Sequence, residues 1–252
     1  MDCSEFVDRL DERLRTDDYA DVDASANGLQ VGRRDGAVER VALAVDAAEA
    51  TIAAAVERDA DLLVVHHGLA WGGFDRMTGL TYDRIEPLVE NDVGLYVSHL
   101  PLDGHQELGN AAGVADVLDL TDREPFGEYG PEVVGTRGTA TEAYGVGEVA
   151  ERLNRGLDTE TQVLAFGPET VRDVGIVTGS GVDWIEAAAN AGLDALVTGE
   201  GKQQAYHEAR DRGINVFLAG HYATETFGVR ALGALAEEWG VETTFVDHPT
   251  GL

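Results

Sequence analysis

The chain lacks the residues that build covalent or cysteine-based frameworks, and it lacks long apolar segments. Cys3 is the one cysteine among 252 residues, so the sequence excludes an intramolecular disulfide and a cysteine-rich zinc cluster. No apolar run approaches the roughly 18 residues that a membrane span requires, and the amino-terminal segment MDCSEFVDRLDERL is amphipathic and acidic. We therefore expect a soluble cytoplasmic protein without a membrane partner.

Positive charge is also scarce. Lysine and arginine number 18 against 47 acidic residues, which gives a formal net charge of −29, and Lys202 is the single lysine. The acidic residues are spread along the chain, as on a solvated surface. Two explanations are open, a partner-specific acidic surface and halophilic adaptation to molar salt that screens self-repulsion; the even spread favours the second. Duplex nucleic acid is disfavoured as a partner, because no basic stripe can displace its counterions.

Alternating strand and helix patterns predict an α/β protein made of two similar lobes with mainly parallel sheets. The first lobe spans 1–125 and the second spans 126–252, and segment 119–160, rich in turn formers and acidic residues, is taken as the crossing between them. The predicted strands of the first lobe are 38–46, 61–68 and 93–101, and those of the second are 133–140, 171–179, 193–200, 214–221 and 241–247. Ligands of open α/β sheets bind at the carboxyl ends of parallel strands, so we expect the site in the cleft between the lobes.

The two lobes also repeat each other in sequence. Residues 38–68 align without a gap on residues 171–201, with identities that include Asp61 with Asp194 and Gly68 with Gly201. Convergent patterning can produce some of these matches, since valine and alanine are common, but a duplicated unit is the favoured interpretation. In this alignment the pair His66-His67 coincides with Gly199-Glu200, so equivalent strand ends carry different polar residues.

Candidate metal ligands stand at the ends of three hydrophobic strands. Imidazole nitrogens and carboxylate oxygens at neighbouring strand ends suit a borderline divalent cation. Six candidates are too many for one tetrahedral ion and suit two ions that share a carboxylate, so we predict a dinuclear site. The candidates occur in LLVVHHG, LYVSHLPLD and VFLAGHYATE and are His66, His67, His99, Asp103, His221 and Glu225.

Each cluster by itself has a simpler interpretation. His66 and His67 could be buried hydrogen-bonded histidines, although burying two polar rings in tandem after LLVV costs free energy. Asp103 precedes Gly104 and could be only a turn former, and Glu225 could be an acid that favours a helix amino terminus. Three such clusters together are much harder to explain by chance. Further candidates are Lys202, for an anionic substrate group, and the pair Asn27 and Gln30, as cleft-wall residues or supporting hydrogen-bond donors.

The motifs NGLQVG, VVHHG, SHLPLD followed by ELGN, LVTGE, and AGHYATE with GVRAL occur in this order. Together they resemble the dinuclear metal-centre hexameric proteins, which are the NGG-interacting-factor-like family, also labelled GTP cyclohydrolase type 2 homologues. The resemblance runs from about Asn27 to about Leu235 and is greatest to the short form without a middle insert. Tyr222 departs from a common version of the last motif, which has a second histidine after the residue matching His221.

The resemblance implies a toroidal homohexamer with two divalent ions per subunit. The implied ligands are His66, His67, Asp103, His221 and Glu225, with Glu225 as the best bridge and His99 as an additional ligand or a nearby group. Zinc, iron, manganese, cobalt and nickel all suit such ligands. The implied function is metal-dependent hydrolysis of a small, nucleotide-like molecule, with His99 and Lys202 as possible helpers. The alternative is a non-enzymatic metal chaperone, store or regulatory scaffold.

Overall fold

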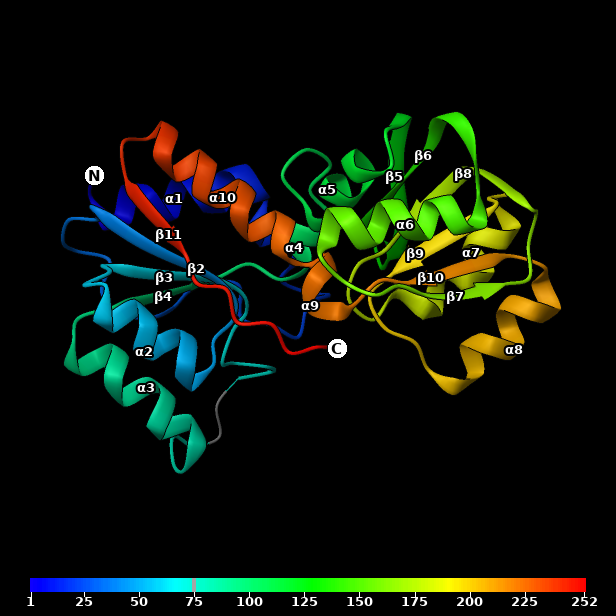
Figure 1. The fold of residues 1–252 in the computed structure, drawn as a ribbon. Coiled ribbons are helices and arrows are strands. Elements are labelled where there is room, and N and C mark those ends of the chain that lie inside the picture. The colour runs from blue at the N-terminus through cyan, green and yellow to red at the C-terminus, as the bar shows by residue number, and fades with distance from the viewer. Residues whose placement is uncertain (74–75) are drawn as a thin grey trace. The chain divides into compact units, whose positions relative to one another are not determined.

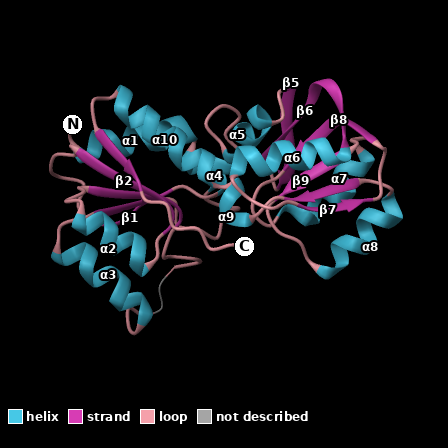
Figure 2. Cartoon of the chain, viewed as in Figure 1, coloured by secondary structure: helices cyan, strands magenta, loops and turns pink. Residues whose placement is uncertain are grey.

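The computed structural model of the protein describes residues 1–73 and 76–252. They divide into two compact units, the first made of Met1–Leu102 with Gly228–His248 and the second of Asp103–Phe227 with Pro249–Leu252. Each unit contains one sheet with helices packed on it (Figures 1 and 2). The predicted α/β class with two lobes is confirmed.

The first unit is built on a five-stranded sheet in the order β1-β4-β3-β2-β11. The strands β4, β3, β2 and β11 are parallel neighbours, and β1 pairs antiparallel with β4. Figure 1 shows α1 and α10 over one face of this sheet and α2 and α3 over the other. The strands are β1 (Gly28–Val31), β2 (Arg40–Asp46), β3 (Leu62–His67), β4 (Gly94–Val97) and β11 (Glu242–Phe245), and the helices are α1 (Cys3–Leu14), α2 (Glu49–Glu57), α3 (Leu80–Glu90) and α10 (Thr226–Glu238).

Alternation along the strands sends side chains into two cores. Leu63 and Val65 pack with Ile52 of α2 and Leu88 of α3 in one buried cluster. On the other face α10 approaches closely, because a side chain at Gly233 would meet Leu43 Cδ1 at 2.8 Å. Both faces of β2 and β3 are therefore buried, which explains the continuous apolar runs that predicted these strands.

The second unit is built on a six-stranded sheet in the order β5-β6-β8-β9-β10-β7. Strands β8, β9 and β10 are parallel, whereas the β5-β6, β6-β8 and β7-β10 pairs are antiparallel. Helices α5 and α6 contribute Val114 and Leu153 to the main core of this unit. The strands are β5 (Leu120–Tyr129), β6 (Glu132–Gly145), β7 (Gln162–Ala165), β8 (Thr170–Ile176), β9 (Ala195–Thr198) and β10 (Asn215–Leu218), and the helices are α5 (Asn110–Val117), α6 (Val146–Leu157), α7 (Ile185–Asn190), α8 (Gln203–Arg212) and α9 (His221–Thr224).

The repeat seen in the sequence is present in the backbone register. Val41 pairs with Leu62 between β2 and β3, and the residues aligned with them, Val174 and Ala195, pair in the same way between β8 and β9. The aligned aspartates also have the same role. Asp61 accepts hydrogen bonds from two backbone N–H groups, at 2.8 and 2.9 Å, and Asp194 does the same at 2.8 and 3.0 Å. A duplicated strand–helix–strand unit explains both similarities.

The unit boundaries differ from the predicted 1–125 and 126–252. The change of unit lies between Leu102 and Asp103, so Asp103 belongs to the second unit and not to the first lobe. The last strand returns to the first unit, because β11 forms a parallel pair with β2. Non-local pairing of this kind has no signature in a local hydrophobic pattern, which is why the sequence placed these elements with their chain neighbours.

Three strands were also not predicted. β1 lies in a segment that reads as turns, and β5 lies in the acidic stretch that reads as a crossing between lobes. β5 is nevertheless a ten-residue strand in which only Leu120, Phe126 and Gly127 are buried, and its acidic residues are exposed. β7 is a short edge strand paired with β10. Edge strands carry few buried residues, so their sequences lack a clear apolar signal.

Candidate metal centre

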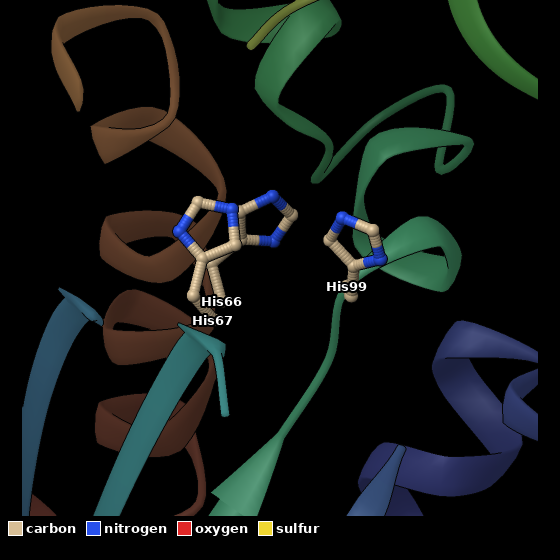
Figure 3. Close-up of side chains that lie close together, drawn as sticks. All are labelled: His66, His67 and His99. Carbon is tan, nitrogen blue, oxygen red and sulfur yellow. The ribbon is translucent and has the colours of Figure 1, made fainter. Parts of the chain in front are cut away.

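His66 and His67 are the last two residues of β3. Adjacent strand residues point to opposite faces, but the strand ends here and the two ring centroids lie only 4.6 Å apart. His66 is completely buried, and 19% of the His67 side chain is exposed. Figure 3 shows the two rings side by side beyond the end of the strand, so both reach the same place.

His99 joins this pair from the segment after β4. Because β3 and β4 are parallel neighbours, their carboxyl ends meet at one edge of the sheet, and the His99 ring centroid lies 5.2 Å from that of His66 and 5.7 Å from that of His67. One ring nitrogen from each of the three lies within 4.8 Å of the other two. The three histidines therefore form one cluster, which we call the histidine cluster.

Each ring of the histidine cluster is oriented through its Nδ1 atom by an oxygen. A carbonyl or carboxylate oxygen accepts hydrogen bonds and does not donate them, so each Nδ1 carries the proton and each Nε2 carries the basic lone pair. Metal-binding histidines are held in this way in proteins. The pairs are His66 with the Ser98 carbonyl oxygen at 2.8 Å, His67 with Asp46 Oδ1 at 2.9 Å and His99 with Asp23 Oδ1 at 2.9 Å.

Asp23 connects His99 to the surrounding backbone. Its carboxylate is buried and also accepts hydrogen bonds from Ser25 N, Asn27 Nδ2 and Leu100 N, at 2.8 to 3.0 Å. Burial raises the pKa of Asp23, but the hydrogen bond and charge of His99 and the other donors outweigh it and leave the pKa below its ordinary value. Asn27 Oδ1 in turn accepts from His99 N at 2.8 Å. His99 is therefore fixed at both its backbone and its ring.

The donor set of the histidine cluster fits a divalent cation. Neutral imidazole is a preferred ligand of zinc, iron, cobalt and nickel. The three rings have their Nδ1 atoms bonded to oxygen acceptors and bring one nitrogen each within 4.8 Å of the other two. Simple hydrogen-bonded core histidines would not need to converge, so the geometry favours ligands over structural histidines.

The second unit carries its own group of candidate ligands, which we call the acidic cluster and which consists of Asp103, His221 and Glu225. His221 begins α9, separated by two residues from the end of β10, and Glu225 caps the end of that short helix. His221 Nε2 lies 3.2 Å from Glu225 Oε2, and a carboxylate oxygen of Asp103 lies within 4.8 Å of one of Glu225. Glu225 is 3% exposed and Asp103 is 7% exposed. Two buried carboxylates beside an imidazole form a site that strongly favours positive charge.

His221 responds to this surplus of negative charge. The hydrogen bond with Glu225 is the main reason that the pKa of His221 rises to about 9, against the opposing effect of burial, and the charges of Glu225 and Glu200 add to it. Glu200 Oε2 lies 3.4 Å from His221 Nδ1. In the metal-free protein a proton on His221 therefore supplies the positive charge that a metal ion would bring.

Two local features position the carboxylates. Asp103 Oδ1 accepts hydrogen bonds from Asn110 Nδ2 at 2.9 Å and Thr178 Oγ1 at 3.2 Å. Gly179 adopts φ +59°, and a Cβ atom there would lie 2.2 Å from Glu225 Oε1. The glycine is thus required both by its left-handed backbone and by the close approach of the glutamate.

Several residues of the site were not identified from the sequence. Asp46 could have been, because it ends β2 beside β3 and a carboxylate at a neighbouring strand end is a detectable signal. Asp23 lies in a polar segment far from His99 in sequence and has no such signal. Gln30, predicted as a supporting residue, accepts hydrogen bonds from Leu69 N and Ala70 N. Lys202 forms an exposed ion pair with Asp183 at 2.9 Å.

Within residues 1–73 and 76–252, no helix combines the length and apolar character that crossing a membrane demands.

Comparison with known proteins agrees with the motifs and the fold. The sequence model of the family Duf34/NIF3 (NGG1p interacting factor 3) matches residues 1–251. The chain is 58% identical to the GTP cyclohydrolase 1 type 2 homolog of Halobacterium salinarum and 43% identical to that of Archaeoglobus fulgidus, in both cases over 100% of both chains. A crystal structure of a protein from Thermus thermophilus is 41% identical, covers 100% of both chains and superposes with a TM-score of 0.91. Full-length matches at this identity lead to one conclusion: the chain belongs to the Duf34/NIF3 (NGG1p interacting factor 3) family.

Proposed function

We propose that the histidine cluster and the acidic cluster bind one pair of divalent ions and that the loaded protein hydrolyses a small, nucleotide-like molecule. The ligands in this proposal are His66, His67, Asp103, His221 and Glu225, with Glu225 as the bridge and His99 as a further ligand. The supporting observation is the orientation of three imidazoles by oxygen acceptors on their Nδ1 atoms. Metal-binding histidines in proteins are held in this way by the atom that does not bind the metal.

The two clusters complement each other chemically. The histidine cluster offers neutral nitrogen donors, and the acidic cluster offers two buried carboxylates that neutralise the charge of the ions. Six donors shared between two ions leave coordination positions for a ligand, which a purely structural site would not need. Strand β10 pairs with β9 as β4 pairs with the aligned strand β3, so His221 follows a strand equivalent to the one that His99 follows, which supports similar ligand positions in the two units.

Bound divalent ions would supply Lewis acidity and would lower the pKa of a coordinated water. The residues of the chain have simpler tasks. Asp46 and Asp23 hold the rings of His67 and His99 in the tautomer that a ligand needs. Asn110 and Thr178 hold the Asp103 carboxylate so that it does not turn away from Glu225.

The substrate and the assembly are inferred from relatives. The names of the Halobacterium and Archaeoglobus proteins refer to GTP cyclohydrolase, which supports a purine nucleotide as the kind of molecule to test first. We also propose a homohexamer, since the family resemblance of the motifs implies it.

The proposal is tested by measuring metal and hydrolysis on the same preparations. Wild-type protein purified without chelators is compared with His67→Ala and Glu225→Ala by elemental analysis, with His207→Ala as a control for an exposed histidine. We expect two ions per subunit in the wild type and the control, and fewer in each of the two variants. Hydrolysis of nucleotides and phosphoesters should disappear on chelation and return with metal.

The outcomes separate the possibilities. Wild-type metal content in both variants would show that the ligand assignment is wrong. Metal loss that leaves every detected activity unchanged would favour the metal chaperone, store or scaffold. A protein that holds metal and hydrolyses a nucleotide only when loaded confirms the proposal.

A further inference from the structure

Trp71 is an exposed aromatic residue beside the histidine cluster. It lies four residues after His67, and 46% of its surface is exposed. The indole contacts His99 in an edge-on arrangement, with centroids 4.9 Å apart and planes at 79°, and its centroid lies 6.1 Å from that of His67. A large apolar ring is therefore displayed to solvent at the edge of the candidate metal centre.

Hydrogen bonds hold the indole and the turn that carries it. Its Nε1 atom donates a hydrogen bond to the Gly68 carbonyl oxygen at 3.2 Å. The Trp71 backbone forms a bridge with Ser25, and Gly72 N donates to Ala24 O at 2.6 Å. Gln30 Oε1 accepts from two backbone N–H groups of the same turn. Such a ring loses little conformational entropy when something binds to it.

The chemistry of the exposed surface selects a flat, apolar ligand group. Because the one polar atom of the indole is already bonded to Gly68, the part presented to solvent is carbon and π-surface. Aromatic rings stack on such a surface, and every nucleobase can do so because each has a π-face. A phosphate group by itself has no aromatic ring to stack on the indole.

We propose that Trp71 binds the planar heteroaromatic ring of the molecule that reaches the histidine cluster, by stacking against it, and that the Gly68 carbonyl fixes the indole for this contact. The inference rests on the proposed function for the position of the reacting group and adds the substrate feature that Trp71 recognises. It makes Trp71 a binding residue that acts on the ring of the ligand and not on the metal.

The test uses guanosine 5′-monophosphate and ribose 5-phosphate. Both contain a phosphorylated ribose, but only the first carries the aromatic guanine ring. Trp71, Trp184 and Trp239 are the three tryptophans of the chain, so a Trp184→Phe, Trp239→Phe background makes Trp71 the sole fluorophore. With metal-loaded full-length protein, we expect saturable quenching by the nucleotide and none by ribose 5-phosphate at the same concentration.

Affinity variants are made in the otherwise wild-type chain, so that they do not depend on the double replacement. Stacking of one base typically changes affinity by about tenfold. Trp71→Ala should therefore weaken nucleotide binding about tenfold by calorimetry, and Trp71→Phe should weaken it less than about threefold, since a smaller ring still stacks. Tyr129→Ala removes an equally exposed aromatic residue of the second unit and should change nothing.

Other results would overturn the inference. Failure of the nucleotide to bind or to quench Trp71, equal binding by Trp71→Ala and wild type, or equal losses in Trp71→Phe and Trp71→Ala would each contradict stacking. A lower oligomeric mass for Trp71→Ala in light scattering would instead assign the ring to a subunit contact. Metal content separates this inference from the proposed function. Quenching by the nucleotide in a protein that holds no metal supports stacking and contradicts the metal centre. A protein that holds metal but is not quenched by the nucleotide contradicts stacking alone.

Discussion

The two units present different ligands on the same scaffold. In the first unit the aligned strand ends in His66 and His67, and in the second it ends at Thr198, so that Gly199 and Glu200 follow the strand. Asp46, which orients His67, aligns with Gly179, whose missing side chain makes room for Glu225. Duplication therefore preserved the strand register, whereas the side chains that can bind a ligand differ at the few positions around the strand ends.

A side chain at Gly179, where the second unit differs from the first, should have the largest effect on stability and metal content. Gly179→Ala places a Cβ against the Glu225 carboxylate and puts a non-glycine residue at φ +59°. We expect the free energy of unfolding to fall by about 1–3 kcal/mol and metal content to fall with it, measured by urea denaturation and elemental analysis. Gly147→Ala, at a site in α6 with open space around it, is the matched control and should not destabilise the protein. Equal effects of the two substitutions would refute the close-approach argument.

The next largest effect concerns the aligned residue of the first unit. Asp46→Ala removes the acceptor that holds Nδ1 of His67. Loss of such a support typically lowers metal affinity about 10- to 100-fold, which a competition titration with a chromophoric chelator measures. Asp183→Ala breaks an exposed ion pair with Lys202 and should leave metal affinity unchanged. An unchanged affinity in Asp46→Ala would mean that His67 is not a ligand.

A pair of equivalent substitutions tests the symmetry itself. Asp61→Ala and Asp194→Ala each remove a carboxylate that accepts two backbone hydrogen bonds at the start of aligned strands. Each should lower the free energy of unfolding by about 1–2 kcal/mol, and the two losses should agree within about 0.5 kcal/mol, by urea denaturation. Unequal losses would show that the duplicated units no longer share their local energetics.

The acidic cluster, which has no counterpart in the first unit, should also give the protein a pH dependence. The pKa of His221 is about 9 in the folded, metal-free protein and about 6.5 in an unfolded chain. The folded state therefore binds this proton more tightly, so its stabilising contribution is complete below about pH 6.5 and is lost as the pH rises to about 9. Urea denaturation of chelator-treated protein across this range should show the decline.

Glu225→Gln removes the main cause of the raised pKa of His221 and should flatten that decline. His207→Ala, an exposed histidine of α8, should leave it intact. A decline of equal slope in Glu225→Gln would place its origin outside the acidic cluster. The same proton must leave before His221 binds a metal ion, so metal affinity should rise with pH over the same interval.

Sequence patterns were sufficient for the elements whose buried faces are local. The apolar runs of β2, β3 and β9 were visible, because burial on both faces leaves a continuous hydrophobic signal. The same strands located His66 and His67, since ligands gather at the carboxyl ends of parallel strands. Salt adaptation, the hexamer and the joint dinuclear site stay predictions.

Tertiary structure alone decided the pairings between distant segments. The sequence by itself determined the α/β class, the duplicated unit and the residue types of the site, because these follow from the period of burial and from donor chemistry. It did not determine that β11 pairs with β2, that Asp103 belongs to the second unit, or that Asp23 holds His99 across 76 residues of chain. Such contacts depend on the closure of long loops, whose free energy varies slowly with length and leaves no mark on local composition.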